Sequence, residues 1–136
     1  MYDDARDMYE LEYPAPDMGS KSGDRPTLVV ALNGYADAGM AVEAAADHLV
    51  SALDHRPVAT FDSDELIDYR SRRPAVTIAN NQPVEIDDTD IDMKILRDNQ
   101  GKPFLLLSGP EPDLRWNGFT EAVADLVEKL DVEQTI

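Results

Sequence analysis

Two short runs of aliphatic and aromatic residues, at 27–32 and 104–107, predict the buried strands of this chain. Neither run alternates with polar residues, which is typical of strands covered on both faces of a sheet. We therefore expect the two strands to be parallel neighbours, or nearly so, in one buried sheet. The fold class predicted is a three-layer α/β/α domain with a mostly parallel sheet.

Apolar residues at helical spacing predict two helices, over 41–53 and 114–130. Asp113 precedes the second helix and is its expected N-cap. A strand at 57–61 follows the first helix, so the segment 27–61 has the pattern of a βαβ crossover.

The residue pattern between 62 and 101 predicts shorter elements. Asp62 or Ser63 can cap a helical turn that ends near residue 67. Runs at 76–78 and 84–86 form a hairpin pattern, and a strand at 93–96 precedes a turn at 99–101.

The two ends of the chain differ from this pattern. Residues 1–26 form an acidic arm rich in proline and glycine, which either docks through its aromatic and apolar residues or stays disordered. The α/β domain is expected over 27–136. Strand-like residues at 132–136 stand where another buried strand would begin, which predicts that the chain is the N-terminal part of a larger domain.

Composition excludes several functions. A net charge of −16 disfavours nucleic-acid binding, which needs basic residues to neutralise phosphates. The apolar runs are far shorter than the ~20 residues of a membrane span, and the acidic N-terminus lacks a secretory signal. With no cysteine in the chain, we expect a soluble cytoplasmic protein.

The loop that follows the first buried strand is the first candidate site. Asn33, Gly34, Asp37 and Gly39 lie where open α/β sheets place ligands. The loop lacks the lysine and hydroxyl of a phosphate-binding loop. It either turns the chain, with Asp37 capping the helix, or holds a ligand.

Gly109 and Glu111 occupy the corresponding loop after the second buried strand. Glu111 could serve acid–base chemistry, although loop geometry explains the same residues. His48 and His55 have no further ligands beside them, and no G-x-S-x-G motif is present. We predict no catalytic residue, no metal site and no cofactor.

The arginine cluster is the third candidate site. Arg70, Arg72 and Arg73 follow Tyr69 within four positions of an acidic chain. Because guanidinium groups pair bidentately with carboxylates and phosphates, the cluster predicts an intramolecular pair, an intersubunit contact or a bound anion.

Four segments together resemble the actinobacterial branch of the proteasome assembly chaperone family, in the group named for the second such chaperone. They are YELEYPAP at 9–16, GYADAG at 34–39, DELIDYRSRRP at 64–74 and GPEPDLRW at 109–116. The resemblance implies a fold similar to purine nucleoside phosphorylases, homo-oligomers with trimers as a candidate form, and protein partners that include proteasome subunits. It implies no established catalysis.

Two interpretations follow. An interaction protein would bind its partner through exposed loops and residues 69–73. A small-molecule binder or enzyme would hold an anion between the two strand-end loops with an inward-pointing arginine. A deep strand-end pocket lined by such an arginine would favour the second interpretation.

Overall fold

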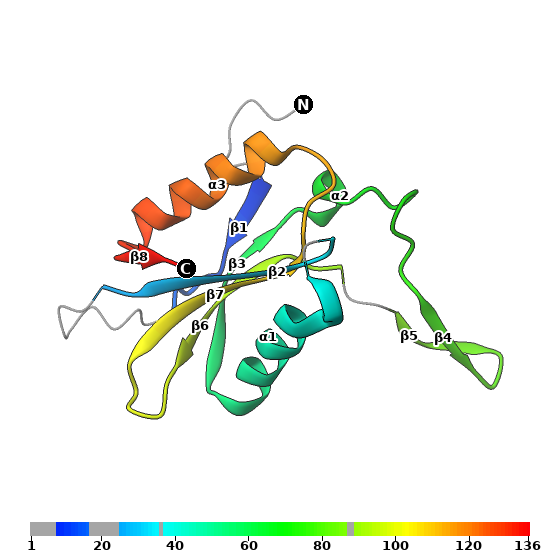
Figure 1. Cartoon of the computed structure of the whole chain (residues 1–136), viewed down its shortest axis with the longest axis horizontal. Coiled ribbons are helices and arrows are strands. Elements are labelled where there is room, and N and C mark those ends of the chain that lie inside the picture. The colour runs from blue at the N-terminus through cyan, green and yellow to red at the C-terminus, as the bar shows by residue number, and fades with distance from the viewer. Residues whose placement is uncertain (1–7, 17–24, 36, 87–88) are drawn as a thin grey trace.

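A six-stranded sheet with a helix on each face forms the body of the protein (Figure 1). The computed structural model describes residues 8–16, 25–35, 37–86 and 89–136. The strands are β1 (Tyr9–Leu11), β2 (Thr27–Asn33), β3 (His55–Phe61), β6 (Asp92–Arg97), β7 (Pro103–Pro110) and β8 (Gln134–Thr135), in the spatial order β1-β3-β6-β7-β2-β8. The helices are η3 (Ala38–Met40), α1 (Ala41–Ala52), α2 (Ser63–Leu66) and α3 (Trp116–Lys129).

The two buried strands predicted from the sequence are parallel neighbours at the centre of this sheet. In β2 and β7, Leu28 pairs with Leu105 and Leu32 with Gly109. Successive side chains of β7 face opposite sides: Leu105 and Leu107 join the core beneath α3, whereas Leu106 joins the core beneath α1. Both faces are therefore covered, which explains the unbroken aliphatic runs and confirms the α/β/α architecture.

The sheet is mixed, with two parallel and three antiparallel pairs. β6 and β7 form an antiparallel hairpin because the Asp98 carboxylate accepts hydrogen bonds from the backbone of Gln100 and Lys102, which closes a tight turn. β3 runs in the same direction as β2, but two strands lie between them. The β2–α1–β3 crossover therefore spans β7 and β6.

Part of the N-terminal arm belongs to the body. Met8 is fully buried, and β1 pairs with β3 at the edge of the sheet. The Tyr9 hydroxyl donates to the Asp125 carboxylate of α3 and accepts from Lys129 Nζ. Docking is thus the outcome for residues 8–16, while 1–7 and 17–24 lie outside the described residues.

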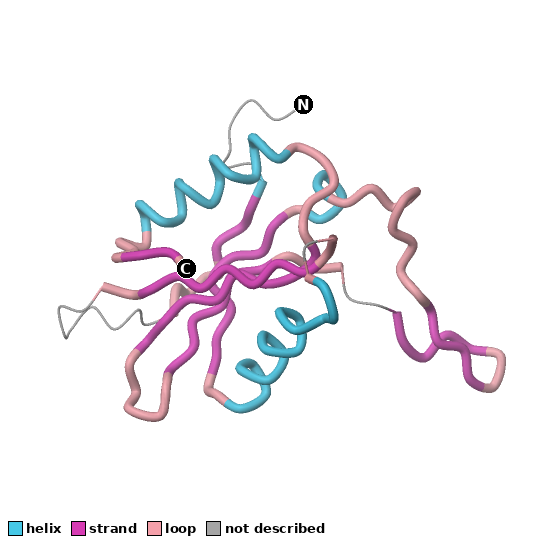
Figure 2. Tube along the Cα trace, in the orientation of Figure 1, coloured by secondary structure: helices cyan, strands magenta, loops and turns pink. Residues whose placement is uncertain are grey.

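A separate two-stranded sheet stands apart from the body (Figure 2). It consists of β4 (Val76–Ala79) and β5 (Gln82–Ile86), as the sequence pattern predicts. Asn80 and Asn81 both have positive φ, at 54° and 61°, which is the geometry of a tight two-residue hairpin turn. None of the helices in the described part of the chain is long and apolar enough to cross a membrane.

Candidate functional site

The two strand-end loops are joined to each other by Glu111. Its backbone N–H donates to the Asn33 carbonyl at 2.7 Å, and its Oε1 accepts from the Tyr35 N–H at 2.9 Å. Gly34 makes this approach possible, because a Cβ at that position would lie 2.5 Å from the Glu111 side chain. Of the predicted candidates, Asn33, Gly34 and Glu111 therefore form one connected unit.

Arg72 connects this unit to the arginine cluster. Its Nη2 donates to the Glu111 carbonyl at 2.7 Å and pairs with Asp113 Oδ1 at 2.8 Å. The Arg72 side chain is 30% exposed and that of Asp113 is 22% exposed. We call Arg72, Asp113 and the Glu111 carbonyl the arginine clamp. The prediction that the cluster contains an intramolecular carboxylate pair thus applies to Arg72.

Asp113 does not cap α3, so that sequence prediction is wrong. Its second oxygen, Oδ2, accepts the Asp68 N–H at 2.9 Å, and its own N–H donates to the Leu66 carbonyl. Arg115 occupies the N-cap position with left-handed backbone geometry and no capping side-chain hydrogen bond. The Asp113 carboxylate instead joins the arginine cluster to the 109–113 loop, three residues before the first residue of α3.

Asp68 organises the turn that carries the cluster. Its Oδ1 accepts from the Arg70 N–H and its Oδ2 from the Ser71 hydroxyl, each at 3.0 Å. Its carbonyl accepts from the N–H groups of Ser71 and Arg72. These bonds lower the pKa of the Asp68 carboxyl, chiefly through the Arg70 N–H and then through the Ser71 hydroxyl.

This lowered pKa predicts a pH dependence of stability. Since the folded state holds Asp68 more tightly as a carboxylate, its contribution is full above the ordinary pKa of 3.8 and is lost as pH falls through the lower folded value. Thermal unfolding of the wild type and of Asp68→Asn, followed from about pH 6 to about pH 3, should give melting temperatures that converge towards the acid end. A constant difference across that range would contradict the assignment.

Asp37 binds the start of α1. Its two carboxylate oxygens accept from the N–H groups of Val42 and Glu43 at 2.9 and 3.0 Å. Gly39 lies between Asp37 and α1, in the short helix η3, with a φ of 80°. This geometry supports the interpretation of the loop as a turn with a capping carboxylate.

Removal of the Asp37 carboxylate should lower the free energy of unfolding. We expect Asp37→Ala to lower the free energy of unfolding by about 1 kcal/mol, because two helix N–H groups lose their acceptor. Urea unfolding measures the loss, and Asp47→Ala, at an exposed site on the same helix, is the matched control with little expected effect. Equal free energies of unfolding for Asp37→Ala and the wild type would show that the hydrogen bonds to the Asp37 carboxylate do not stabilise the fold.

A cavity of about 580 Å³ lies where β2 and β7 end, between the sheet and α1. Gly109 belongs to its lining, and a Cβ there would come within 2.3 Å of the Asp90 carbonyl, so only glycine allows this approach. Four carboxylates and Lys94 supply the charge of the lining, and Lys94 pairs with Asp92. No arginine is among the described residues that line the cavity, and the net negative charge of this lining disfavours anions.

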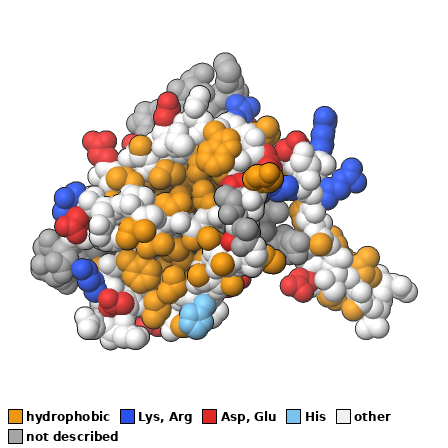
Figure 3. Space-filling view, viewed as in Figure 1, with side chains coloured by type: hydrophobic (Ala, Val, Ile, Leu, Met, Phe, Trp, Pro, Cys, Tyr) orange, Lys and Arg blue, Asp and Glu red, His pale blue; other side chains and the backbone are white. Residues whose placement is uncertain are grey.

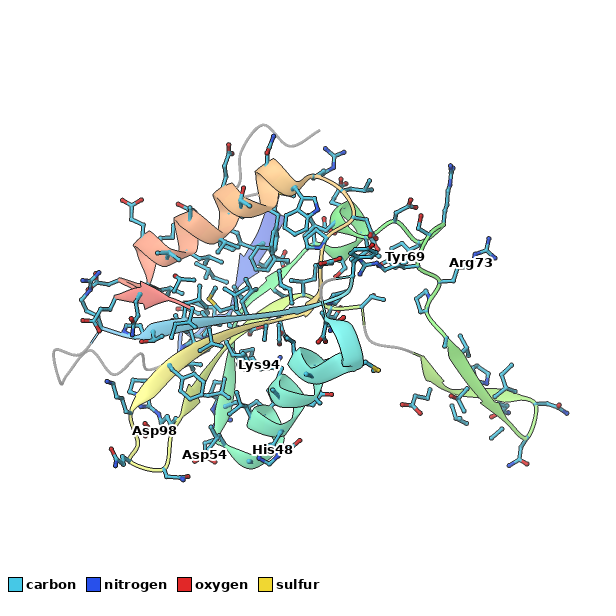
Figure 4. The ribbon with its side chains drawn as sticks, in the orientation of Figure 1. His48, Asp54, Tyr69, Arg73, Lys94 and Asp98 are labelled. Atoms are coloured by element: carbon cyan, nitrogen blue, oxygen red, sulfur yellow. The ribbon has the colours of Figure 1, made fainter. Side chains whose placement is uncertain are left out.

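The remaining members of the cluster face outwards. Arg70 and Arg73 are exposed, and Tyr69 is partly exposed beside them. Figure 4 shows Arg73 pointing away from the body at the start of the segment that leads to β4. His48 and His55 are exposed, as expected. Among the described residues no group of His, Cys, Asp and Glu has the arrangement of a metal site.

The sequence did not reveal how far the hairpin would project. Its apolar side chains lie in solvent: Val76 is 47% exposed, Ile78 67% and Val84 60%. In Figure 3 hydrophobic side chains lie along the projection, and Lys or Arg side chains lie where it leaves the body. We call Tyr69, Arg70, Arg73 and the hairpin the hairpin surface.

A family model described as the PAC2 family matches residues 31–136, a range that contains both strand-end loops, the arginine clamp and the hairpin. The chain belongs to the PAC2 family. The resemblance to proteasome assembly chaperones is thereby confirmed. Among curated proteins no significant match was found.

Solved structures of actinobacterial proteins share this PAC2 fold. A protein of unknown function from Corynebacterium glutamicum is 58% identical, with a TM-score of 0.89, and the match covers 94% of this chain and 48% of that one. A Mycobacterium tuberculosis protein of unknown function is 52% identical, with a TM-score of 0.88 and coverage of 94% and 44%. A proteasome-assembly chaperone homologue from M. tuberculosis is 25% identical, with a TM-score of 0.70 and coverage of 80% and 47%. The PAC2 chain thus spans about half the length of these relatives.

Proposed function

We propose that this PAC2 chain is a protein-interaction module that binds its partner through the hairpin surface. The observation that carries the proposal is the projecting hairpin, whose apolar side chains contact solvent. An isolated two-stranded sheet is at best marginally stable in water, and each exposed apolar Å² costs about 25 cal/mol relative to burial. A partner that covers the hairpin would remove both penalties.

The charges beside the hairpin indicate what kind of partner fits. Arg70 and Arg73 are exposed in the segment that leads to β4, so an acidic protein surface with an apolar patch would complement the hairpin surface. A second copy of this chain has that character, with a net charge of −16. We propose two kinds of partner in the cytoplasm. One is further copies of this chain, which would form homo-oligomers, with trimers as one form. The other is proteasome subunits.

The alternative, an anion-binding enzyme at the strand ends, receives less support. It needs an arginine that points into the cavity, whereas Arg72 is engaged in the clamp and Arg73 points away. The carboxylates of the cavity lining would repel a phosphate or carboxylate ligand.

One substitution at the hairpin tests the proposal. Ile78→Glu should abolish self-association and binding to purified proteasome subunits, because a charged group at the centre of an apolar contact must be desolvated. Sedimentation velocity measures the assembly state. Met40→Glu is the matched control, since Met40 is 63% exposed but belongs to another element, at the N-terminal end of α1. Unchanged association of the Ile78→Glu variant, with a normal melting temperature, would rule out the hairpin surface.

A further inference from the structure

Ser71 is an exposed hydroxyl in the middle of the arginine cluster. It lies on the Asp68–Arg72 turn, with Arg70 before it and Arg72 and Arg73 after it. The hydroxyl donates a hydrogen bond to Asp68 Oδ2 at 3.0 Å. An accessible serine flanked by basic residues is the type of substrate that arginine-directed protein kinases recognise through charge.

Ser71 lies where a chemical change can alter the position of the hairpin surface. The turn is closed by Asp68, which also accepts a hydrogen bond from the Ser71 hydroxyl, and it is joined to the body by the arginine clamp. The chain runs directly from this turn through Arg73 to β4. A change at Ser71 therefore acts on the base of the projecting hairpin.

We propose that Ser71 is a phosphorylation site and that its phosphate opens the turn by drawing Arg72 away from Asp113. The serine oxygen forms a bond to the γ-phosphorus of a nucleoside triphosphate, supplied with a Ser/Thr protein kinase. The bond from that phosphorus to the bridging oxygen breaks, the nucleoside diphosphate leaves with the electron pair, and the hydroxyl proton passes to the kinase's base.

The consequences follow from charge and hydrogen bonding. A phosphoserine carries about −1.5 to −2 at pH 7, so it repels the Asp68 carboxylate beside it and can no longer donate a hydrogen bond there. Its oxygens are strong acceptors for guanidinium groups, and Arg70, Arg72 and Arg73 are its neighbours in the chain. Arg72 is the arginine whose contacts should change most, because it would replace its ion pair with the Asp113 carboxylate by a contact with the more highly charged phosphate. As a result, the turn is no longer held to Asp113, and the phosphate neutralises part of the positive charge of the arginines.

The effect on partner binding rests on the proposed function, whereas modification and turn opening do not depend on it. Opening is visible in the Asp68 N–H, which Asp113 Oδ2 accepts, and in the Ser71 and Arg72 N–H groups bound to the Asp68 carbonyl. Loss of one of these hydrogen bonds should speed hydrogen exchange of the amide that makes it about tenfold.

The experiment has two arms. In the first, the chain and a free peptide of residues 66–76 are incubated with ATP and an arginine-directed Ser/Thr kinase, and mass spectrometry locates the phosphate. We expect modification of Ser71 in both, none in Ser71→Ala and less in Arg73→Gln. A peptide that is modified while the folded chain is not, or absence of modification in both, overturns the proposal.

In the second arm, phosphoserine is installed at position 71 during translation and hydrogen exchange is compared with the unmodified chain. The expected result is about tenfold faster exchange at residues 68–72, with the central strands unchanged. Phosphoserine at Ser51, an exposed site on α1 away from the cluster, is the matched control and should leave these amides unaffected. Unchanged exchange with phosphoserine at 71 overturns the switch, even if the hairpin surface binds its partner as proposed.

Discussion

Replacement of Leu66 by alanine is expected to lower the free energy of unfolding by about 2–5 kcal/mol, the largest effect among our predictions. Leu66 is fully buried, in the main hydrophobic core with Phe61 and Phe119. Its side chain fixes α2 against the sheet, and its carbonyl accepts from the N–H groups of Asp113 and Leu114. A cavity at this position should weaken both the core and the support of the arginine clamp.

Urea unfolding measures this loss directly. Leu114→Ala is the matched control: Leu114 is 45% exposed on the adjoining segment, so its truncation should change stability by less than about 1 kcal/mol. A loss below about 1 kcal/mol for Leu66→Ala would mean that the site collapses without a cavity, contrary to its position in the core.

Removal of Arg72 from the clamp is expected to have the second largest effect. Exposed ion pairs contribute about 0–1 kcal/mol, whereas breaking a buried pair costs about 3–5 kcal/mol. The intermediate burial of Arg72 and Asp113 places the expected loss for Arg72→Met at about 2 kcal/mol. Arg72→Lys should restore only part of it, because both contacts are made by Nη2 at the tip of the planar guanidinium, and the shorter lysine keeps the charge but does not hold its ammonium at that point.

A double-mutant cycle separates the pair from its surroundings. If Arg72 acts through Asp113, then Arg72→Met combined with Asp113→Asn should cost less than the sum of the two single changes. Arg73→Met is the control, since Arg73 is exposed and points away from the body. Additive losses, or equal losses for Arg72→Met and Arg73→Met, would show that the clamp is not a coupled unit.

The central fold could be predicted because its signals are local. Unbroken aliphatic runs identified β2 and β7 as doubly covered strands, and helical spacing located α1 and α3. Asp37 was recognised as a helix-capping candidate because its partners lie five and six residues away. The mixed character of the sheet depends on how β6 pairs with β7, and an apolar strand pattern does not specify the direction of its neighbour.

The site was harder to predict because its contacts are distant in sequence. Asp113 stands before a helical pattern, as an N-cap does, yet its partners are Asp68 and Arg72, more than forty residues earlier. No local rule indicates such a contact. The hairpin was recognised from its two strands and turn, but its separation from the body reflects the absence of a pairing with the six-stranded sheet, which only the three-dimensional arrangement reveals.

Hydrogen exchange of the β4–β5 amides tests most directly whether the hairpin surface is a binding site. Exchange is followed at low and high concentrations of the chain, and again with purified actinobacterial proteasome subunits, with the β6–β7 hairpin as internal control. The account predicts fast exchange in the isolated chain, slowed at least about tenfold when the chain self-associates or binds these subunits. Equally fast exchange under every condition, while association occurs elsewhere, would contradict it.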